Sequence, residues 1–361
     1  MRYAERLART RARMEELGVD VLCCSVGPDL PYLTGYEAMP LERLTMLVVA
    51  RDEPAVLVVP RLEAPRVEPQ PDVFSIEPWD ETDDPVDRVA TLARGAHTIA
   101  IGDQTWARFV LALQERLPSA RFTSATEVLG PLRAVKGPDE IERLRAAAEA
   151  VDAIAVAMRE QRFHGRTELD VQRELNERIL EAGHERVNFA IVASGPNAAS
   201  PHHDAIDRVI EVGDVVLCDF GGTMHRYCSD ITRMFVVGEP APEVRDAYDA
   251  LCAAQDAAVR AATVGTPCEE VDAVARGVLR EAQLADWFVH RTGHGIGLDA
   301  HEDPYMVAGN TTPLVAGHAF SVEPGVYLPG RFGLRLEDIV VASDDGPVRL
   351  NHAPRDLAIV D

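Results

Sequence analysis

Positive charge is scarce in this sequence, which also has no long apolar run and no paired cysteine motif. Lysine and arginine together number 36 against 59 aspartates and glutamates, so the formal net charge is −23. So acidic a surface argues against nucleic acid or an anionic membrane as a partner, because both are themselves negatively charged. It favours solubility and the retention of cations.

The sequence also shows no pattern typical of a signal peptide, a membrane-spanning helix or a structural zinc site. Residues 1–20 are charged and helix-like, without the apolar core of a signal peptide. No run approaches the roughly 18 apolar residues of a membrane span. The six cysteines form no CxxC pair and have no histidines at zinc-finger spacing. We therefore expect reduced thiols in a cytoplasmic protein.

The chain is long enough for two domains, and its pattern changes about a third of the way along. Its 361 residues are 47% hydrophobic and 26% charged, as in ordinary folded proteins. Residues 1–132 alternate helical segments with short apolar ones, which predicts a mixed α/β domain. The run RAVKGP interrupts this pattern, and we place the second domain at 133–361.

Local signals predict several elements. In the first domain we expect a helix that ends at Gly18, strands at VDVLCCS, TMLVVA, AVLVVP and Ala96–Gly102, a turn at GPDLPYLTGY, and a helix over 106–117. In the second domain, Gly137 and Pro138 predict a helix start. A further helix is predicted over 167–182, between a Thr-x-x-Asp cap and a glycine.

The most informative feature is an ordered set of one histidine and four carboxylates. They are Asp219, Asp230, His294, Glu323 and Glu337. Such a hard, oxygen-rich set suits two divalent cations side by side. Four carboxylates and a hydroxide nearly balance the four positive charges, which makes the cluster tolerable in a partly buried cleft. The sequence therefore predicts a two-metal hydrolase.

The contexts of these residues support this interpretation. Asp219 lies on one face of a predicted strand, before an expected tight turn at Gly221 and Gly222, and Asp230 opens the return strand. The alternative reading is a turn-capping Asp219 and a solvated Asp230. His294 lies in the glycine-rich HRTGHGIG, and Glu323 ends the strand HAFSVE.

An arginine accompanies the last carboxylate. Arg335 and Glu337 in GLRLEDIVV share one face of a period-two strand. We therefore expect Arg335 to keep the neighbouring carboxylate ionised and oriented.

Five blocks together resemble the pita-bread metallopeptidases, the family of prolidase, aminopeptidase P, methionine aminopeptidase and the metal-free creatinase. They are SGPNAASPHH, LCDFGGTMHRYCSDITR, HRTGHGIGLDAHEDP, FSVEPGVY and GLRLEDIV. The amino-terminal part resembles the creatinase-type amino-terminal domain. The resemblance implies an α+β fold, with a smaller α/β domain before the pita-bread catalytic domain, and a homodimer.

The resemblance also implies roles. Asp219 chelates the first metal, Asp230 and Glu337 bridge the pair, and His294 and Glu323 complete the second. Glu323 also shuttles the proton from a metal-bridging hydroxide or water to the leaving nitrogen. Substrate-handling histidines fall at His202, His290 and His301, where His301 stabilises the tetrahedral intermediate and His202 contacts the substrate backbone. His290 as a structural neighbour is the alternative.

Within this family the motifs HEDP and SPHH favour an Xaa-Pro dipeptidase acting on dipeptides or short peptides. The implied cofactors are two divalent ions, Mn(II) or Co(II) before Zn(II). An Xaa-Pro aminopeptidase, or a hydrolase of a small non-peptide amide, is the alternative among enzymes. A non-catalytic peptide- or protein-binding module is the alternative outside them. The sequence leaves open the residue before proline and the length of the peptide.

Overall fold

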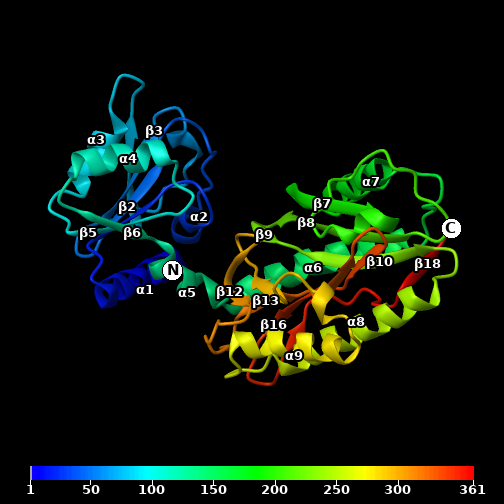
Figure 1. Cartoon of the computed structure of the whole chain (residues 1–361). Coiled ribbons are helices and arrows are strands. Elements are labelled where there is room, and N and C mark those ends of the chain that lie inside the picture. Colours follow the sequence, from blue (N-terminus) through cyan, green and yellow to red (C-terminus); the bar gives the residue numbers. More distant parts are fainter. Residues whose placement is uncertain (1) are drawn as a thin grey trace. The chain divides into compact units, whose positions relative to one another are not determined.

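The structure is a computed structural model that describes residues 2–361 (Figure 1). The chain forms two compact units, one up to Arg133 and the other Ala134–Asp361. Among the described residues, none of the helices has the length and apolar character needed to cross a bilayer.

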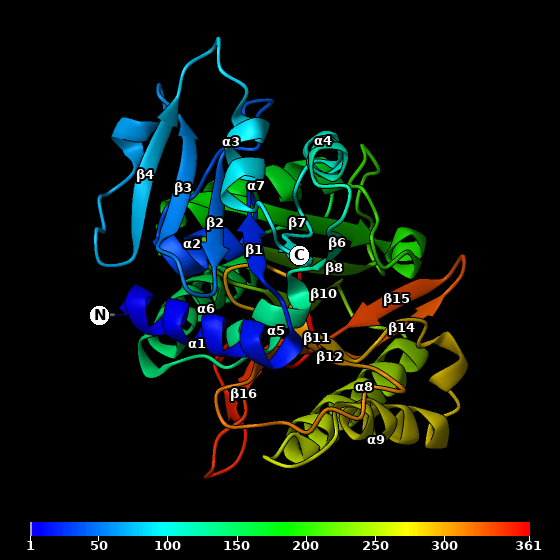
Figure 2. The ribbon, with the colours of Figure 1, turned by 90° about the vertical axis from the view of Figure 1, so that its left-hand side faces the viewer.

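A mixed six-stranded sheet forms the centre of the amino-terminal unit, in the order β4-β3-β2-β1-β5-β6 (Figure 2). β1 pairs antiparallel with β2 and parallel with β5. The strands are β1 (Val21–Cys24), β2 (Met46–Ala50), β3 (Ala55–Pro60), β4 (Phe74–Trp79), β5 (Thr98–Ile101) and β6 (Arg121–Ser124). The helices are α1 (Arg2–Leu17), α2 (Asp29–Thr34), η1 (Ala64–Arg66), α3 (Pro85–Leu92), α4 (Ala107–Arg116) and α5 (Thr126–Ala134). The four predicted strands and both predicted helices of this unit are present.

The predicted turn at GPDLPYLTGY is wrong, because this segment forms the short helix α2. Gly35 ends the helix in a left-handed conformation, with φ 74°, and its N–H donates to the Pro31 carbonyl. Pro31 lies within the first turn of the helix, where a missing N–H costs little. A proline there is therefore compatible with a helix as well as with a turn.

Two five-stranded sheets and a hairpin form the carboxyl-terminal unit. One sheet has the order β18-β10-β8-β7 with β9 added to β8, the other has the order β12-β11-β13-β16-β17, and β14 pairs with β15. The strands are β7 (Arg186–Ser194), β8 (Val215–Met224), β9 (Tyr227–Cys228), β10 (Ile231–Val237), β11 (Gly293–Gly295), β12 (Glu302–Met306), β13 (Ala319–Val322), β14 (Gly325–Leu328), β15 (Phe332–Arg335), β16 (Asp338–Val341), β17 (Val348–Arg349) and β18 (Ala358–Val360). An isolated bridge between Thr232 and Glu337 connects the two sheets.

Helices pack against these sheets, and α8 and α9 contact each other (Figure 1 and Figure 2). The helices are α6 (Pro138–Met158), α7 (Glu168–Glu181), η2 (Gly195–Ala199), α8 (Pro242–Ala261), α9 (Cys268–Glu281) and η3 (Ala285–Trp287). α6 begins where the local signals predict, and α7 both begins and ends where they predict. Thr167 caps α7 through its hydroxyl, which accepts from the Asp170 N–H, and the Asp170 carboxylate accepts from the Thr167 N–H.

The predicted turn at Gly221 and Gly222 is also wrong, since β8 continues through both to Met224. These glycines serve close packing instead. A Cβ on Gly221 would lie 2.0 Å from the Ser229 carbonyl oxygen, and one on Gly222 would lie 2.7 Å from that of Arg186. The chain turns later, at His225, which has φ 50°.

Candidate metal centre

A cleft of about 760 Å³ opens in the carboxyl-terminal unit. All the site residues expected from the sequence line it, namely His202, Asp219, Asp230, His290, His294, His301, Glu323, Arg335 and Glu337. Phe189, Ile191 and Val289 add apolar surface to its wall. Polar groups that converge in a partly apolar cleft are typical of a binding or catalytic site.

The five expected metal ligands come from strands of both sheets or from the residues next to them. Asp219 lies within β8, and Asp230 lies directly before its antiparallel partner β10. His294 is the central residue of β11, and Glu323 directly follows β13. Glu337 lies between β15 and β16, at the bridge that connects the sheets. The site therefore forms where the two sheets meet.

Glycine allows the strands to approach closely beside His294. A Cβ on Gly293 would lie 1.9 Å from the Ser321 carbonyl oxygen, and one on Gly295 would lie 2.1 Å from that of Asp303. Any other residue would push β11 away from its neighbours. The HRTGHGIG motif thus fixes the distance from His294 to the carboxylates on the other strands.

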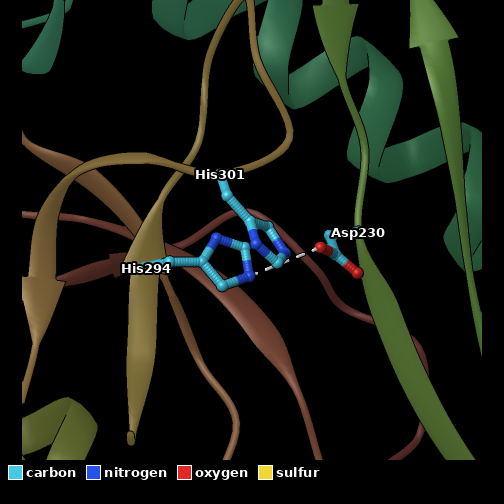
Figure 3. A group of neighbouring side chains, drawn as sticks. All are labelled: Asp230, His294 and His301. Carbon is cyan, nitrogen blue, oxygen red and sulfur yellow. Dashed lines mark ion pairs between the residues drawn. The ribbon is translucent and has the colours of Figure 1, made fainter. Parts of the chain in front are cut away.

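The ligand atoms form overlapping groups within which all atoms lie no more than 4.8 Å apart. One group is Asp219, Asp230 and Glu337, and a second is His294, Glu323 and Glu337. A third joins Asp230 and His294 to His301, whose ring centroid lies 3.8 Å from that of His294 (Figure 3). Glu337 belongs to the first two groups, so a pair of ions held by them would share it.

The hydrogen bonds of His294 leave one ring nitrogen facing the carboxylates. Nδ1 lies 3.1 Å from the Gly295 carbonyl oxygen, which only accepts, so Nδ1 carries the proton. Nε2 lies 3.2 Å from Glu323 Oε1 and 3.8 Å from Asp230 Oδ2. Burial, aided by His301, lowers the pKa of His294 to about 3. A neutral ring with a lone pair directed at two carboxylates suits a metal ligand.

The carboxylates are buried together and carry excess negative charge. Burial, followed by repulsion from Glu337, raises the pKa of Asp230 well above its usual value. The pKa of Glu337 is likewise raised by burial and then by Glu323. Burial raises the pKa of Glu323 to about 7, against the opposing charge of Arg335. Asp219 Oδ1 is buried without a hydrogen-bond partner among the described residues. Divalent cations would relieve both the repulsion and this unpaired oxygen, so the donor set fits them.

The closest acidic partner of Arg335 differs from the expected one. Its guanidinium pairs with Asp219 Oδ2 at 2.5 Å, whereas the Thr232 hydroxyl separates it from Glu337. Thr232 Oγ1 accepts from Arg335 Nε at 3.2 Å and donates to Glu337 Oε2 at 2.7 Å. A threonine on β10 therefore occupies the space between the arginine and Glu337, which the period-two pattern did not indicate.

Both ring nitrogens of His290 are already used within the protein. Nδ1 lies 2.7 Å from the Arg291 carbonyl oxygen and must donate to it. Nε2 therefore accepts from the Tyr327 hydroxyl at 2.8 Å, and that hydroxyl accepts from Arg335 at 2.7 Å. Burial lowers the pKa of His290 to about 4, which matches a neutral ring. This arrangement favours the structural alternative for His290 over direct substrate contact.

The two adjacent histidines of the SPHH motif have different surroundings. His202 lines the cleft, whereas His203 Nε2 contacts Glu168 Oε2 at 2.8 Å. Glu168 is fully buried, and its other oxygen accepts from the Ser194 N–H and hydroxyl, each at 2.7 Å. Burial raises the Glu168 pKa, but hydrogen bonds from Ser194, His203 and Asn197 outweigh burial and lower it. Glu168 thus anchors the loop that carries His202, a link absent from the sequence pattern.

Sequence reasoning missed several residues of this network. Thr232, Tyr327 and Glu168 carry no motif of their own, and only their distant partners reveal them. Arg291 had a usable signal, since it lies within HRTGHGIG between the two selected histidines.

The stability of the metal-free protein should fall as pH rises from about 5 to 8. Between pH 4.5 and about 7, which are the usual and the raised pKa of Glu323, the folded protein keeps a proton on Glu323 that the unfolded chain releases. Its contribution therefore destabilises the fold as pH rises through this window, by on the order of 3 kcal/mol. Saturating Mn(II) should reverse the trend, because metal binding requires deprotonated ligands. Urea unfolding across this range measures both, and equal pH slopes with and without Mn(II) would contradict the expectation.

Comparison with known proteins places the chain in a family. Residues 142–344 match Metallopeptidase family M24, and residues 6–135 match the Creatinase/Prolidase N-terminal domain. The chain belongs to the M24 metallopeptidases and is a metal-dependent hydrolase. The expected α+β pita-bread architecture, with a creatinase-type amino-terminal domain, is thereby confirmed.

Relatives named as dipeptidases or prolidases match nearly the whole chain. The crystal structure of dipeptidase PepE from Mycobacterium ulcerans is 44% identical with a TM-score of 0.92, and the match covers 99% of this chain and 98% of that one. A prolidase structure from Thermococcus sibiricus is 35% identical with a TM-score of 0.94, covering 99% of each chain. The Xaa-Pro dipeptidase of Lactobacillus helveticus is 34% identical over 365 residues, which are 96% of each protein.

Proposed function

We propose that this protein is a two-metal dipeptidase that hydrolyses Xaa-Pro dipeptides. The observation that carries the proposal is the convergence of one neutral histidine and four carboxylates in one cleft, with Arg335 as their buried cationic neighbour. The names of the prolidase and Xaa-Pro dipeptidase relatives support the choice of substrate.

Asp219, Asp230 and Glu337 would hold one ion, and His294, Glu323 and Glu337 would hold the other. Asp230 is also grouped with His294, which supports its role as a second bridging ligand beside Glu337. The unpartnered Asp219 Oδ1 supports binding of an ion through that oxygen, while Oδ2 accepts from Arg335. Oxygen-rich ligation supports Mn(II) or Co(II) before Zn(II). When bound, such ions activate a water molecule and polarise the scissile carbonyl.

The protein's own side chains handle the proton and the substrate. Glu323 uses Oε1 to contact Ser321 and His294, which leaves Oε2 to exchange a proton. A carboxylate in this position can accept a proton and then donate it at neutral pH. A proline nitrogen needs this proton because it leaves poorly without it. His301 and His202 face the cleft, where they would contact the developing oxyanion and the substrate backbone.

Arg291 supports a preference for dipeptides over longer peptides. Its guanidinium stacks on Tyr305, 4.3 Å from the ring centroid, and lies 3.4 Å from His301 Nδ1. Within residues 2–361 it forms no ion pair with a carboxylate. The scissile carbonyl and the terminal carboxylate of a dipeptide lie one residue apart, and each further residue adds up to about 3.6 Å. A free carboxylate directly after the scissile bond would thus reach Arg291.

Hydrolysis by metal-stripped and Mn(II)-reloaded protein tests the proposal. We expect Mn(II)-dependent cleavage of Ala-Pro that disappears in Glu323→Gln. Arg291→Met should raise KM for Ala-Pro at least tenfold while leaving KM for Ala-Pro amide unchanged. Cleavage of longer Xaa-Pro peptides but not of Ala-Pro would indicate an aminopeptidase. Cleavage of creatine or another small amide alone would indicate a non-peptide substrate, and no bound metal would indicate a binding module.

We further propose a cytoplasmic homodimer. The six cysteines, none of them in a disulfide, support a reducing compartment. The family resemblance supports the dimer, and light scattering of the purified protein tests it.

A further inference from the structure

The sequence contains a single lysine, and all its other basic side chains of this kind are arginines. Lysines and arginines together number 36, and Lys136 is the only lysine. It lies between α5 and α6 and is 4% exposed. A buried ammonium is rare in proteins unless it is paired, so we expect a specific acidic partner for Lys136.

Lys136 pairs with Glu302 inside the carboxyl-terminal unit. Nζ lies 2.6 Å from Glu302 Oε1, and the two side chains are 1% and 7% exposed. Gly297 provides the space, since a Cβ there would lie 2.4 Å from Glu302 Oε1 and 3.0 Å from Lys136 Cε. A compact ammonium fits here, whereas a planar guanidinium needs more room. The backbone of Lys136 is fixed as well, because its N–H donates to the Gly317 carbonyl at 2.8 Å.

Glu302 connects this ion pair to the metal centre. It is the first residue of β12 and is paired in register with Gly295, the neighbour of His294. His301 directly precedes Glu302, so an ion pair that holds the start of β12 also holds the backbone from which the imidazole extends. The His301 ring lies against that of His294, with their centroids 3.8 Å apart (Figure 3).

We propose that Lys136 is a positioning residue for His301 and acts through Glu302. The ion pair holds the start of β12, and with it the imidazole that faces the reacting carbonyl. Displacement of such a group by about 1 Å can reduce the rate by about a hundredfold. The kinetic test rests on the proposed peptidase function, whereas the spectroscopic test below does not.

A double-mutant cycle on Mn(II)-loaded protein tests the link. Lys136→Met should lower kcat for Ala-Pro about 10- to 100-fold with little change in KM. The double variant Lys136→Met/His301→Ala should be no slower than His301→Ala alone, because both changes remove the same interaction. Multiplied losses in the double variant would overturn the proposal. Arg159→Met, which breaks the exposed pair with Asp356, is the control and should leave kcat unchanged.

Histidine-labelled protein provides a test without turnover. The imidazole NMR signal of His301 is identified by its absence from His301→Ala. This signal should shift in Lys136→Met, whereas the signal of His97 in the amino-terminal unit should not. An unmoved His301 signal would overturn the proposal even if Ala-Pro is hydrolysed. A shifted signal without hydrolysis would uphold it and reject only the peptidase function. If Lys136→Met does not fold, Glu302→Gln keeps the shape, weakens the ion pair and takes its place in both tests.

Discussion

Glu337→Gln is expected to abolish metal-dependent hydrolysis and, at the same time, to stabilise the metal-free protein. Glu337 belongs to two of the three overlapping ligand groups, the two proposed to hold the ions, so its loss affects the sites of both ions. We expect a loss of at least a thousandfold in kcat/KM for Ala-Pro, because water activation and carbonyl polarisation depend on the ions. Metal analysis should find fewer than two Mn(II) per chain.

The gain in stability has a separate cause. Burial and the neighbouring Glu323 already disfavour the ionised form of Glu337. A neutral amide removes one of four crowded carboxylates and still accepts the hydrogen bond from Thr232. Relief of this repulsion should stabilise the metal-free fold by on the order of 1–3 kcal/mol. Saturating Mn(II), which stabilises the native protein by about 2.7 kcal/mol at a hundred times Kd, should stabilise the variant much less.

Urea unfolding with and without Mn(II) measures both effects. Glu239→Gln is the matched control, because it removes the same charge from a side chain that is 81% exposed. It should change neither stability nor activity appreciably. A Glu337→Gln protein that keeps two ions and full activity, or that is less stable than the native protein without metal, would refute the proposed ligand set.

Arg233→Met is expected to cause a large loss of stability. All five N–H groups of Arg233 are used. Its acceptors are the carbonyls of Thr232, Glu337, Ala353 and Pro354 and the Asp338 carboxylate, which lies 2.7 Å away. The arginine is 3% exposed and connects β10, the β15–β16 link and the carboxyl-terminal segment. Methionine would leave a buried carboxylate and several carbonyls without this donor.

We expect a loss of about 3–5 kcal/mol in the free energy of unfolding, as for other broken buried ion pairs. Urea unfolding of the metal-free protein at pH 7 measures it. Adding Asp338→Asn should recover part of the loss, since the buried Asp338 would otherwise keep only Arg349, 3.3 Å from its other oxygen, as a cationic partner. Arg159→Met, at an exposed pair, should cost no more than about 1 kcal/mol. A loss of similar size in both arginine variants would show that burial of the Arg233 network contributes little.

The sequence by itself determined the elements whose signals are local. The starts of α6 and α7 follow from Gly137, Pro138 and the Thr167 cap, because capping groups lie within one turn of the residues they satisfy. The apolar runs of the amino-terminal unit form the predicted strands. The ordered carboxylates and histidine, with their glycine-rich motif, were sufficient to indicate the family and the chemistry.

Only the tertiary structure decided which residues meet. Gly221 and Gly222 continue a strand, because the carbonyls that require glycine there belong to other segments. Arg335 pairs with Asp219, which is 116 positions away in the sequence, and Lys136 pairs with Glu302, which is 166 positions away. Such contacts depend on how sheets and loops pack, and packing leaves no periodic trace in the sequence. Local hydrogen bonds can therefore be read from the chain, whereas the partners of a buried charge are known only after it folds.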